Sequence, residues 1–529
     1  MKDARRVLAG YRTSEAPIAA IDPPVVEQRD RKPARRLAVT QAILVGFALL
    51  IVAQLVRWQV IQRGAWKDLP SGGIGYRAEA LEQRGLLLDR RYAVLALNSY
   101  NYEVFAAPNQ IPEADTLDVA RQLALALGWP LEEMLARLEG DDLYAPLEQQ
   151  VPLPVGKAVL DLRLPGIYAR PHSVRVYPEG SLAAHTLGFV AGDAKEGSRG
   201  YYGLEGFYDR VLKNKKSLDE SALDPMEVFG AQQPFTFVDT GVFAQASAGQ
   251  RLSGRTLVLT IDKTIQYLVE QELQAAVERY GAEGGSILVL EPKTGALLAS
   301  ASYPAYDPRR FGEIEERLFV DPAIGRAYEP GSTFKVVTIA AGIESGVVHP
   351  DDLYNDLGFI EVGGRTFKNW DEKSYGLVSM EDVFAWSLNT GMAHVSVLLE
   401  PARFYHYVDR FGFGHKTGID LEGEVAGVVR NRGDAEWHES DLGTNAFGQG
   451  LAVTPLQMVT AVGAVANRGY MMKPHVVARM IDGPLSGVGS NSDGTLGRVL
   501  EVRQVTERQV VSEETARTSS RAGPGRDRA

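Results

Sequence analysis

Cysteine is absent from this 529-residue chain. Without thiols the protein has no disulfides, no zinc–thiolate or iron–sulfur site and no cysteine nucleophile. Positive charge is also scarce, because 56 Lys and Arg stand against 67 Asp and Glu, which gives a net charge of −11. A net negative chain repels phosphate backbones, so we expect no nucleic-acid partner.

Two further absences concern ligands and repeats. None of the eight histidines has a His-x-x-x-His spacing, which together with the lack of cysteine predicts that no metal or organic cofactor is used. No internal repeat of 20–50 residues is evident, so the chain is not a solenoid or a propeller.

One long apolar run is present. Residues 37–56 read LAVTQAILVGFALLIVAQLV and carry no charge. At about 1.5 Å per residue this run spans the ~30 Å hydrocarbon core, which predicts a transmembrane helix over residues 37–57. A buried soluble helix or a cleaved signal peptide fits less well, because the run is long and is bounded by charge.

The charges around this run predict its orientation. Basic residues cluster just before it and place the Pro- and charge-rich residues 1–36 in the cytoplasm as a disordered tail. We therefore expect a single-pass protein of the cytoplasmic (inner) membrane, with its bulk outside the cytoplasm.

The remaining sequence divides into two regions. Residues 76–253 contain strand-like runs at 102–105 and 173–177 and a helical stretch at 117–127, and end in a loop-rich connection over residues 214–253. The second region begins with a strand at 257–262, a helix at 264–280 and a hairpin at 285–301 around a Pro-Lys-Thr-Gly turn. This mixture indicates an α+β protein.

The candidate nucleophile is Ser332. Residues 329–335 read EPGSTFK, in which Pro-Gly is a breaker and Ser332 stands where an apolar helix begins. Lys335 lies three residues on and shares its face. Burial and neighbouring cations lower a lysine pKa, and the neutral amine can then take the serine proton. The competing interpretation makes Ser332 a simple helix N-cap, and the Ser-x-x-Lys spacing alone does not decide between them.

Residues 329–335 resemble the active-site motif of class B penicillin-binding proteins, the membrane-anchored peptidoglycan D,D-transpeptidases. The resemblance runs from the membrane helix to about residue 518, and its layout is most similar to the septal, division type. Further segments resemble this family in the same order: 84–90, 175–178, 183–188, 203–206, 260–262, 265–266, 447–450 and 453–457.

The second family motif is similar to residues 387–389, Ser-Leu-Asn. The resemblance implies that Ser387 relays a proton between Lys335 and the leaving amine. It implies that Asn389 holds Lys335 and hydrogen-bonds the substrate, while Leu388 need not face the cleft. An isolated Ser-x-Asn would instead be a turn that satisfies local backbone groups.

The third motif departs from the family pattern. Lys-Thr-Gly occurs at 293–295 and 416–418, whereas the family places it on a strand after the segment that resembles residues 510–518. We expect a helix capped by Ser512 there, followed by a divergent tail at 519–529. This pattern predicts a truncated, frameshifted or non-catalytic chain, in which the strands around 286–301 lack partners.

The resemblance implies an elongated α+β pedestal (dimerisation) domain over residues 76–253. It also implies a serine β-lactamase-like, penicillin-binding transpeptidase domain over residues 254–518 that lacks its last strands. Stem peptides, β-lactams and membrane-anchored division proteins are the implied partners. The alternative function is an inactive, penicillin-binding or scaffold protein; a β-lactam sensor or β-lactamase fits less well, because the long pedestal resembles neither.

Overall fold

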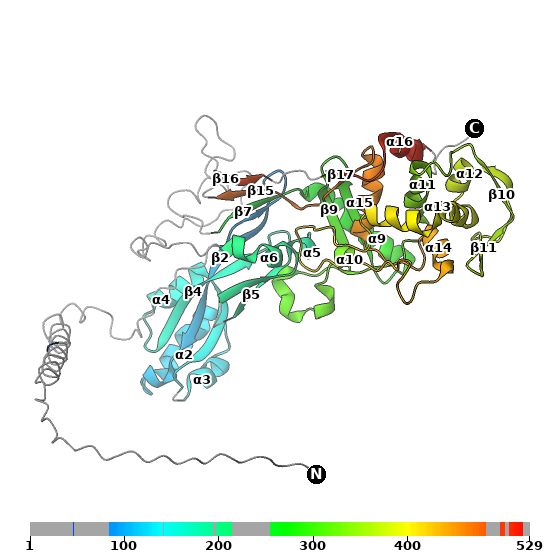
Figure 1. The fold of residues 1–529 in the computed structure, drawn as a ribbon. Coiled ribbons are helices and arrows are strands. Elements are labelled where there is room, and N and C mark those ends of the chain that lie inside the picture. Colours follow the sequence, from blue (N-terminus) through cyan, green and yellow to red (C-terminus); the bar gives the residue numbers. More distant parts are fainter. Residues whose placement is uncertain are drawn as a thin grey trace, which may run out of the picture. The chain divides into compact units, whose positions relative to one another are not determined.

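The computed structural model describes residue 46 and residues 84–140, 142–193, 197–213, 254–482, 498–502 and 507–521. The predicted cytoplasmic tail, the membrane helix apart from Gly46, the 214–253 connection and residues 522–529 lie outside these ranges. Of the helices described, none combines the length and the apolar character needed to cross a membrane. The described residues from Arg84 onward belong to one compact unit, whose elements are shown in Figure 1.

The first region of this unit mixes short helices with strands. Its elements are β1 (Leu87–Leu88), β2 (Val94–Ala106), η2 (Pro108–Gln110), α2 (Thr116–Leu127), α3 (Leu131–Leu138), β3 (Ala145–Pro152), α4 (Leu153–Asp161), β4 (Ile167–Val176), α5 (Ala184–Leu187), β5 (Phe189–Asp193), β6 (Gly197–Tyr201), α6 (Gly203–Phe207) and α7 (Asp209–Lys213).

The long strand β2 organises this region. It pairs antiparallel with β3 on one side and β4 on the other. The apolar faces of α2 and α3, including Leu123 and Met134, are buried together with Val104 of β2. Helix α2 ends where Gly128 takes a left-handed backbone, as glycine does readily. The predicted strands at 102–105 and 173–177 and the helix at 117–127 are confirmed.

The second region carries most of the helices. Its elements are β7 (Thr256–Leu259), α9 (Lys263–Tyr280), β8 (Gly285–Glu291), β9 (Ala296–Tyr303), η3 (Pro308–Glu313), η4 (Glu316–Leu318), α10 (Pro322–Gly325), η5 (Gly331–Phe334), α11 (Lys335–Glu344), β10 (Leu353–Asp356), β11 (Phe359–Val362), β12 (Arg365–Lys368), β13 (Gly376–Ser379), α12 (Met380–Ala385), α13 (Asn389–Arg410), α14 (Glu439–Ala446), α15 (Pro455–Ala466), β14 (Tyr470–Met472), β15 (Val477–Asp482), β16 (Arg498–Val502), β17 (Glu507–Gln509) and α16 (Glu513–Arg521).

One seven-stranded sheet draws on both regions. Its order is β16-β15-β7-β1-β2-β3, with β4 also paired to β2, and β7 lies parallel to β1. Leu87 and Leu88 of β1 and all four residues of β7 are buried, because short apolar strands are stable only between neighbours. The predicted boundary at residues 253/254 therefore precedes a strand that belongs to the sheet of the first region.

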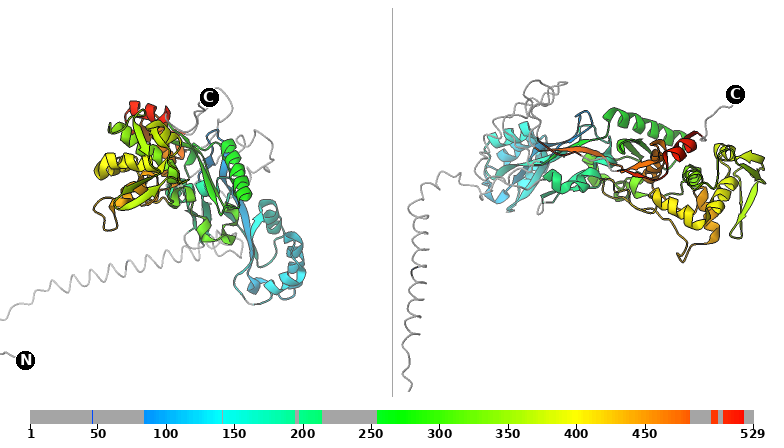
Figure 2. Two further views of the ribbon diagram at one scale, coloured as in Figure 1. Left: turned by 90° about the vertical axis from the view of Figure 1, so that its right-hand side faces the viewer. Right: turned by 45° about the horizontal axis from the view of Figure 1, so that its top comes forward.

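The helices around α11 form the core next to the candidate nucleophile. Helix α11 packs against α13, and α16 packs on both α11 and α15, as Figures 1 and 2 show. The apolar residues that follow Ser332, such as Val337 and Ile339, are buried as expected. Phe334 joins the same cluster.

Helix α16 begins as expected, because the Ser512 hydroxyl accepts a hydrogen bond from the Thr515 N–H. It continues to Arg521, three residues beyond the predicted end at residue 518. The Ser519 side chain is buried and the Ser520 hydroxyl donates to the Ala516 carbonyl, so both serines fit inside the last turn.

The predicted hairpin at 285–301 is present as β8 and β9, an antiparallel pair. Among the strands described, β8 pairs with β9 alone, and its residues 285–290 are half-buried. Strand β9 has one further backbone contact, because Ala296 at its start forms a parallel bridge with His475. The expectation that these strands lack further partners is therefore met for β8 but not for β9 in this part of the chain.

Candidate active site

Ser332 lies in η5, a single 3-10 turn that leads directly into α11. In such a turn residues i and i+3 eclipse, so Ser332 and Lys335 share a face, as predicted. Pro330, not Ser332, stands at the start of the turn, and no hydrogen bond of the Ser332 side chain occurs in the described part. The N-cap interpretation is therefore wrong, and the hydroxyl is exposed.

The turn that carries Ser332 is held by the Phe-Gly-Gln-Gly segment at 447–450. Gly331 donates its N–H to the Gly448 carbonyl at 2.9 Å, and the Glu329 carboxylate accepts from the Gly450 N–H at 2.8 Å. The backbones are so close that a Cβ on Gly448 would lie 2.1 Å from the Gly331 oxygen. Only glycine allows this approach.

Lys335 is the first residue of α11, and its side chain is only 1% exposed. Its Nζ donates to the Ser387 carbonyl at 2.6 Å, to the Ser387 hydroxyl at 3.0 Å and to Asn389 Oδ1 at 2.7 Å. Burial lowers the pKa of Lys335 to about 8. Desolvation suffices for this shift, so the neighbouring cations that we expected are not its cause.

Ser387 contacts Lys335 from the loop between α12 and α13, and Asn389 contacts it from the first residue of α13. Ser387 has a φ of 59°, a left-handed backbone that non-glycine residues adopt uncommonly. Leu388 is completely buried, which leaves its two polar neighbours to face Lys335, as expected. The structure thus brings Lys335, Ser387 and Asn389 into direct contact, one turn after Ser332.

The two Lys-Thr-Gly copies have structural partners elsewhere. In the β8–β9 turn the Thr294 hydroxyl donates to Glu291 at 2.6 Å, and the Gly295 N–H donates to the Glu291 carbonyl at 2.9 Å. In the second copy, Glu424 accepts from the Thr417 N–H and from the Gly418 N–H, at 2.6 and 3.0 Å. Within the described ranges, neither copy contacts the Ser332 site.

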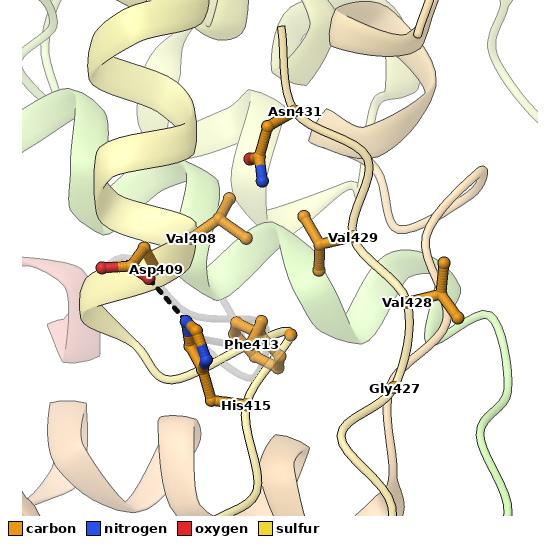
Figure 3. A pocket seen from close by; sticks show the side chains of 9 residues that line it. Val408, Asp409, Phe413, His415, Gly427, Val428, Val429 and Asn431 are labelled. Carbon is orange, nitrogen blue, oxygen red and sulfur yellow. Dashed lines mark hydrogen bonds and ion pairs between the residues drawn. The ribbon is translucent and has the colours of Figure 1, made fainter. Parts of the chain in front are cut away.

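A separate pocket lies beside the C-terminal end of α13. It has a volume of about 270 Å³ and is lined by Val408, Asp409, Phe413, Gly414, His415, Gly427, Val428, Val429 and Asn431. Figure 3 shows the hydrogen bond between Asp409 and His415 at its edge. The pocket contains none of the four predicted site residues, although Phe413 packs on Phe334 with ring centroids 5.0 Å apart.

No candidate metal site is present among the described residues, because no group of three or more His, Asp or Glu side chains lies close enough together to hold an ion. The expected absence of a cofactor stays a prediction.

Three polar residues behind the site escaped sequence reasoning. Asp356, Asn369 and Thr390 are buried and hydrogen-bond to one another just behind Asn389. Thr390 directly follows the predicted Asn389, whereas Asp356 and Asn369 stand singly in other segments, where no spacing or composition signal marks them. Only the folded chain brings them together.

Comparison with known proteins gives two family matches. The penicillin binding protein transpeptidase domain matches residues 285–521. The penicillin-binding protein dimerisation domain matches residues 80–231. The dimerisation match lies inside residues 76–253, and the transpeptidase match ends at residue 521, three residues beyond the expected end of the second region at residue 518.

Relatives of established name are similar over most of the chain. Stage V sporulation protein D of Bacillus subtilis is 31% identical over 443 residues, which is 82% of this chain and 64% of the relative. PbpB of Mycolicibacterium smegmatis is 31% identical over 80% of this chain, and the chain spans 58% of its length. Peptidoglycan D,D-transpeptidase FtsI of Escherichia coli is 27% identical over 87% of this chain and 76% of the relative.

Solved structures are similar in fold. Penicillin binding protein 3 of Mycobacterium tuberculosis, complexed with aztreonam, has a TM-score of 0.57 and 26% identity over 84% of this chain and 74% of that chain. The ampicillin complex of the same protein has a TM-score of 0.56.

Proposed function

Since the chain belongs to the class B penicillin-binding proteins, we propose that it is a peptidoglycan D,D-transpeptidase that acts through an acyl-serine on Ser332. The observation that carries this proposal is the buried Lys335 amine. Its three hydrogen bonds to Ser387 and Asn389 hold it one turn from an exposed serine hydroxyl. A serine with a neighbouring low-pKa amine is an activated nucleophile.

The contacts of Lys335 specify how it would serve as a base. The Ser387 carbonyl and Asn389 Oδ1 can only accept hydrogen bonds, so each of them binds one N–H of the neutral Lys335 amine. The remaining lone pair can accept from a hydroxyl, either that of Ser387 or that of Ser332. Lys335 would take the Ser332 proton as Oγ attacks the carbonyl carbon of the penultimate D-Ala of a stem peptide.

The proton then follows the leaving group. The C–N bond to the terminal D-Ala breaks, and its amine leaves with the proton that Lys335 returns through the Ser387 hydroxyl, 3.0 Å from Nζ. An ester on Ser332 remains. The amine of a neighbouring peptide attacks this ester, forms the cross-link and restores the Ser332 hydroxyl.

The relatives support the finer parts of the proposal. Aztreonam and ampicillin complexes of penicillin binding protein 3 suggest that β-lactams acylate Ser332 here as substrate mimics. We further propose a septal role with membrane-anchored division proteins as partners. Residues 37–57 would anchor the chain in the cytoplasmic membrane, with the pedestal and transpeptidase domains outside the cytoplasm.

One observation favours the alternative of a non-catalytic scaffold. The family uses Lys-Thr-Gly beside the serine, whereas both copies in the described ranges are engaged by Glu291 and Glu424. Such a chain would bind division partners without forming an acyl-serine.

Labelling with a fluorescent penicillin separates these functions. The full chain should acquire one covalent label on Ser332, located by peptide mass spectrometry, and Ser332→Ala should abolish it. Ser345→Ala, at the C-terminal end of α11, is the matched control and should label normally. A folded wild-type chain that takes no label, or a Ser332→Ala variant that still does, would overturn the proposal.

A further inference from the structure

Asp356 is a buried carboxylate at the end of β10, and its side chain has no exposed surface. Its Oδ1 accepts hydrogen bonds from the Gly358 N–H at 3.0 Å and from the Thr390 hydroxyl at 2.8 Å. Its Oδ2 accepts from Asn369 Nδ2 and from the Tyr375 N–H, both at 2.9 Å. All four donors are neutral, so the buried charge is compensated by hydrogen bonds alone.

The first connection from Asp356 to the site runs through Thr390. Thr390 follows Asn389 directly in the first turn of α13, and its side chain is completely buried. Its hydroxyl donates to Asp356, and its N–H donates to Asn369 Oδ1 at 3.3 Å. The backbone at the start of α13 is thereby fixed on the Asp356 carboxylate.

The second connection runs through Asn369 and determines which way the Asn389 amide points. Asn369 is held by Asp356, and the preceding residue, Lys368, presents its carbonyl to Asn389 Nδ2 at 3.1 Å. With Nδ2 bonded there, Oδ1 is the atom left to face Lys335, at 2.7 Å from Nζ. A reversed amide would place a donor against the ammonium group instead.

We propose that Asp356 is a positioning residue for Lys335, because it fixes both the backbone and the amide orientation of Asn389. This proposal rests on the proposed function of the Ser332 site. The simpler possibility is that Asp356 only stabilises the small sheet of β10 and β13. These two roles predict different results. Only in the positioning role does loss of the Asp356 carboxylate alter the chemistry of Lys335, which Asp356 does not contact.

Asp356→Asn is the principal test, because it removes one acceptor oxygen and the charge while keeping the shape. Asp420→Asn is the matched control. Asp420 is 1% exposed and likewise accepts from two backbone N–H groups, those of Val476 and Val477, and from the Tyr208 hydroxyl. Both variants should lower the unfolding temperature. Only Asp356→Asn should slow penicillin acylation of Ser332, by roughly 10- to 100-fold, as for other losses of alignment.

A second pair of variants addresses the connection through Thr390. Thr390→Ser keeps the hydroxyl and should acylate at close to the wild-type rate, whereas Thr390→Val removes it and should be slow. In the double variant with Asp356→Asn, the two losses should be less than additive, because both break the same hydrogen bond. Folded Asp356→Asn and Thr390→Val proteins with wild-type rates would overturn the proposal.

A readout independent of penicillin separates this proposal from the proposed function. The rate at which an amine-reactive reagent modifies Lys335 is followed against pH by peptide mass spectrometry, with the exposed Lys157 of the first region as internal reference. Asp356→Asn should change the reactivity of Lys335 relative to Lys157, and Asp420→Asn should not. If the wild-type chain takes no penicillin label, the proposed function fails while this comparison still decides the role of Asp356. If Asp356→Asn fails to fold, Thr390→Val carries the same comparison.

Discussion

At the scale of single residues, the titration of Lys335 governs the expected chemistry. Burial lowers its pKa to about 8, and only the neutral amine accepts the Ser332 proton. The rate of penicillin acylation should therefore rise with pH from 6, reach half its maximum near pH 8 and level off above pH 9. A stopped-flow or gel-based rate series with the fluorescent penicillin measures this profile.

The control for this profile is the Asn389→Ala variant, which removes one hydrogen-bond acceptor from the ammonium group. Loss of that acceptor favours the neutral amine, so the midpoint should move to lower pH while the maximal rate falls. A profile that is flat between pH 6 and 9 would show that Lys335 is not the base.

Gly448 supplies a second prediction at this scale. Its φ is 80°, and a Cβ would collide with Gly331, so Gly448→Ala should destabilise the protein by about 2–3 kcal/mol and slow acylation by displacing the Ser332 turn. Thermal unfolding and labelling measure the two effects. Gly281→Ala is the control, because Gly281 also has a positive φ but open space around it, so that only about 1 kcal/mol should be lost.

The sequence predicts the candidate site residues themselves, but not the buried residues that hold them in position. Ser332, Lys335, Ser387 and Asn389 stand in short motifs whose spacing is local, and the last three meet as expected. Asp356 comes 33 residues before Asn389 in the chain and acts through hydrogen bonds that depend on the packing of β10 and β12 against α13. No local pattern encodes such a contact.

At the scale of elements, α16 is fixed by its first turn. Ser512 caps this helix, and the Glu344 carboxylate at the end of α11 accepts from both the N–H and the hydroxyl of Ser512, at 2.9 and 2.7 Å. Ser512→Ala should lower the free energy of unfolding by about 1 kcal/mol, as for other lost caps. Urea unfolding at pH 7 measures the loss, and Ser520→Ala near the end of α16 is the control, with little expected change.

The same contact predicts a pH dependence. Burial opposes ionisation of Glu344, but hydrogen bonds from Thr515 and Ser512 outweigh it, so the pKa of Glu344 lies below its usual value. A depressed carboxylate pKa contributes stability above the unfolded pKa, and this contribution is lost as pH falls through the folded pKa. The difference in unfolding free energy between the wild type and Ser512→Ala should therefore become smaller from pH 7 to pH 3. A gap that widens on acidification would contradict this assignment.

Elements defined by short-range signals were predicted well, and pairings between distant segments were not. The hairpin of β8 and β9 follows from a turn of four residues, and the predicted helix at 264–280 is present as α9. The preceding strand was predicted to reach residue 262, but β7 ends at Leu259 and Asp262 caps α9 instead. The pairing of β7 with β1 joins segments about 170 residues apart, and sequence periodicity gives no register for it. The predicted end of α16 at residue 518 was wrong, because two serines that read as a tail fit into its last turn.

At the scale of the whole molecule, the seven-stranded sheet couples the two regions. Leu257 of β7 is fully buried between Leu87 of β1 and Met480 of β15. Leu257→Ala should cost about 2–5 kcal/mol and shift one common unfolding transition to lower temperature. Calorimetry measures this, with the 88%-exposed Leu125→Ala as control. Two separate transitions of which only one moves would show that the regions unfold independently.

The unpaired side of β8 has a consequence for the protein in concentrated solution. Among the strands that the structure describes, β8 pairs with β9 alone, and a strand paired on one side can add an extended chain on the other side. Residues 285–290 are glycine, serine and aliphatic residues and carry no charge to discourage such pairing. Neighbouring copies can supply that chain. The fraction of self-associated protein should therefore rise with protein concentration, because pairing between copies through this edge competes with the monomer.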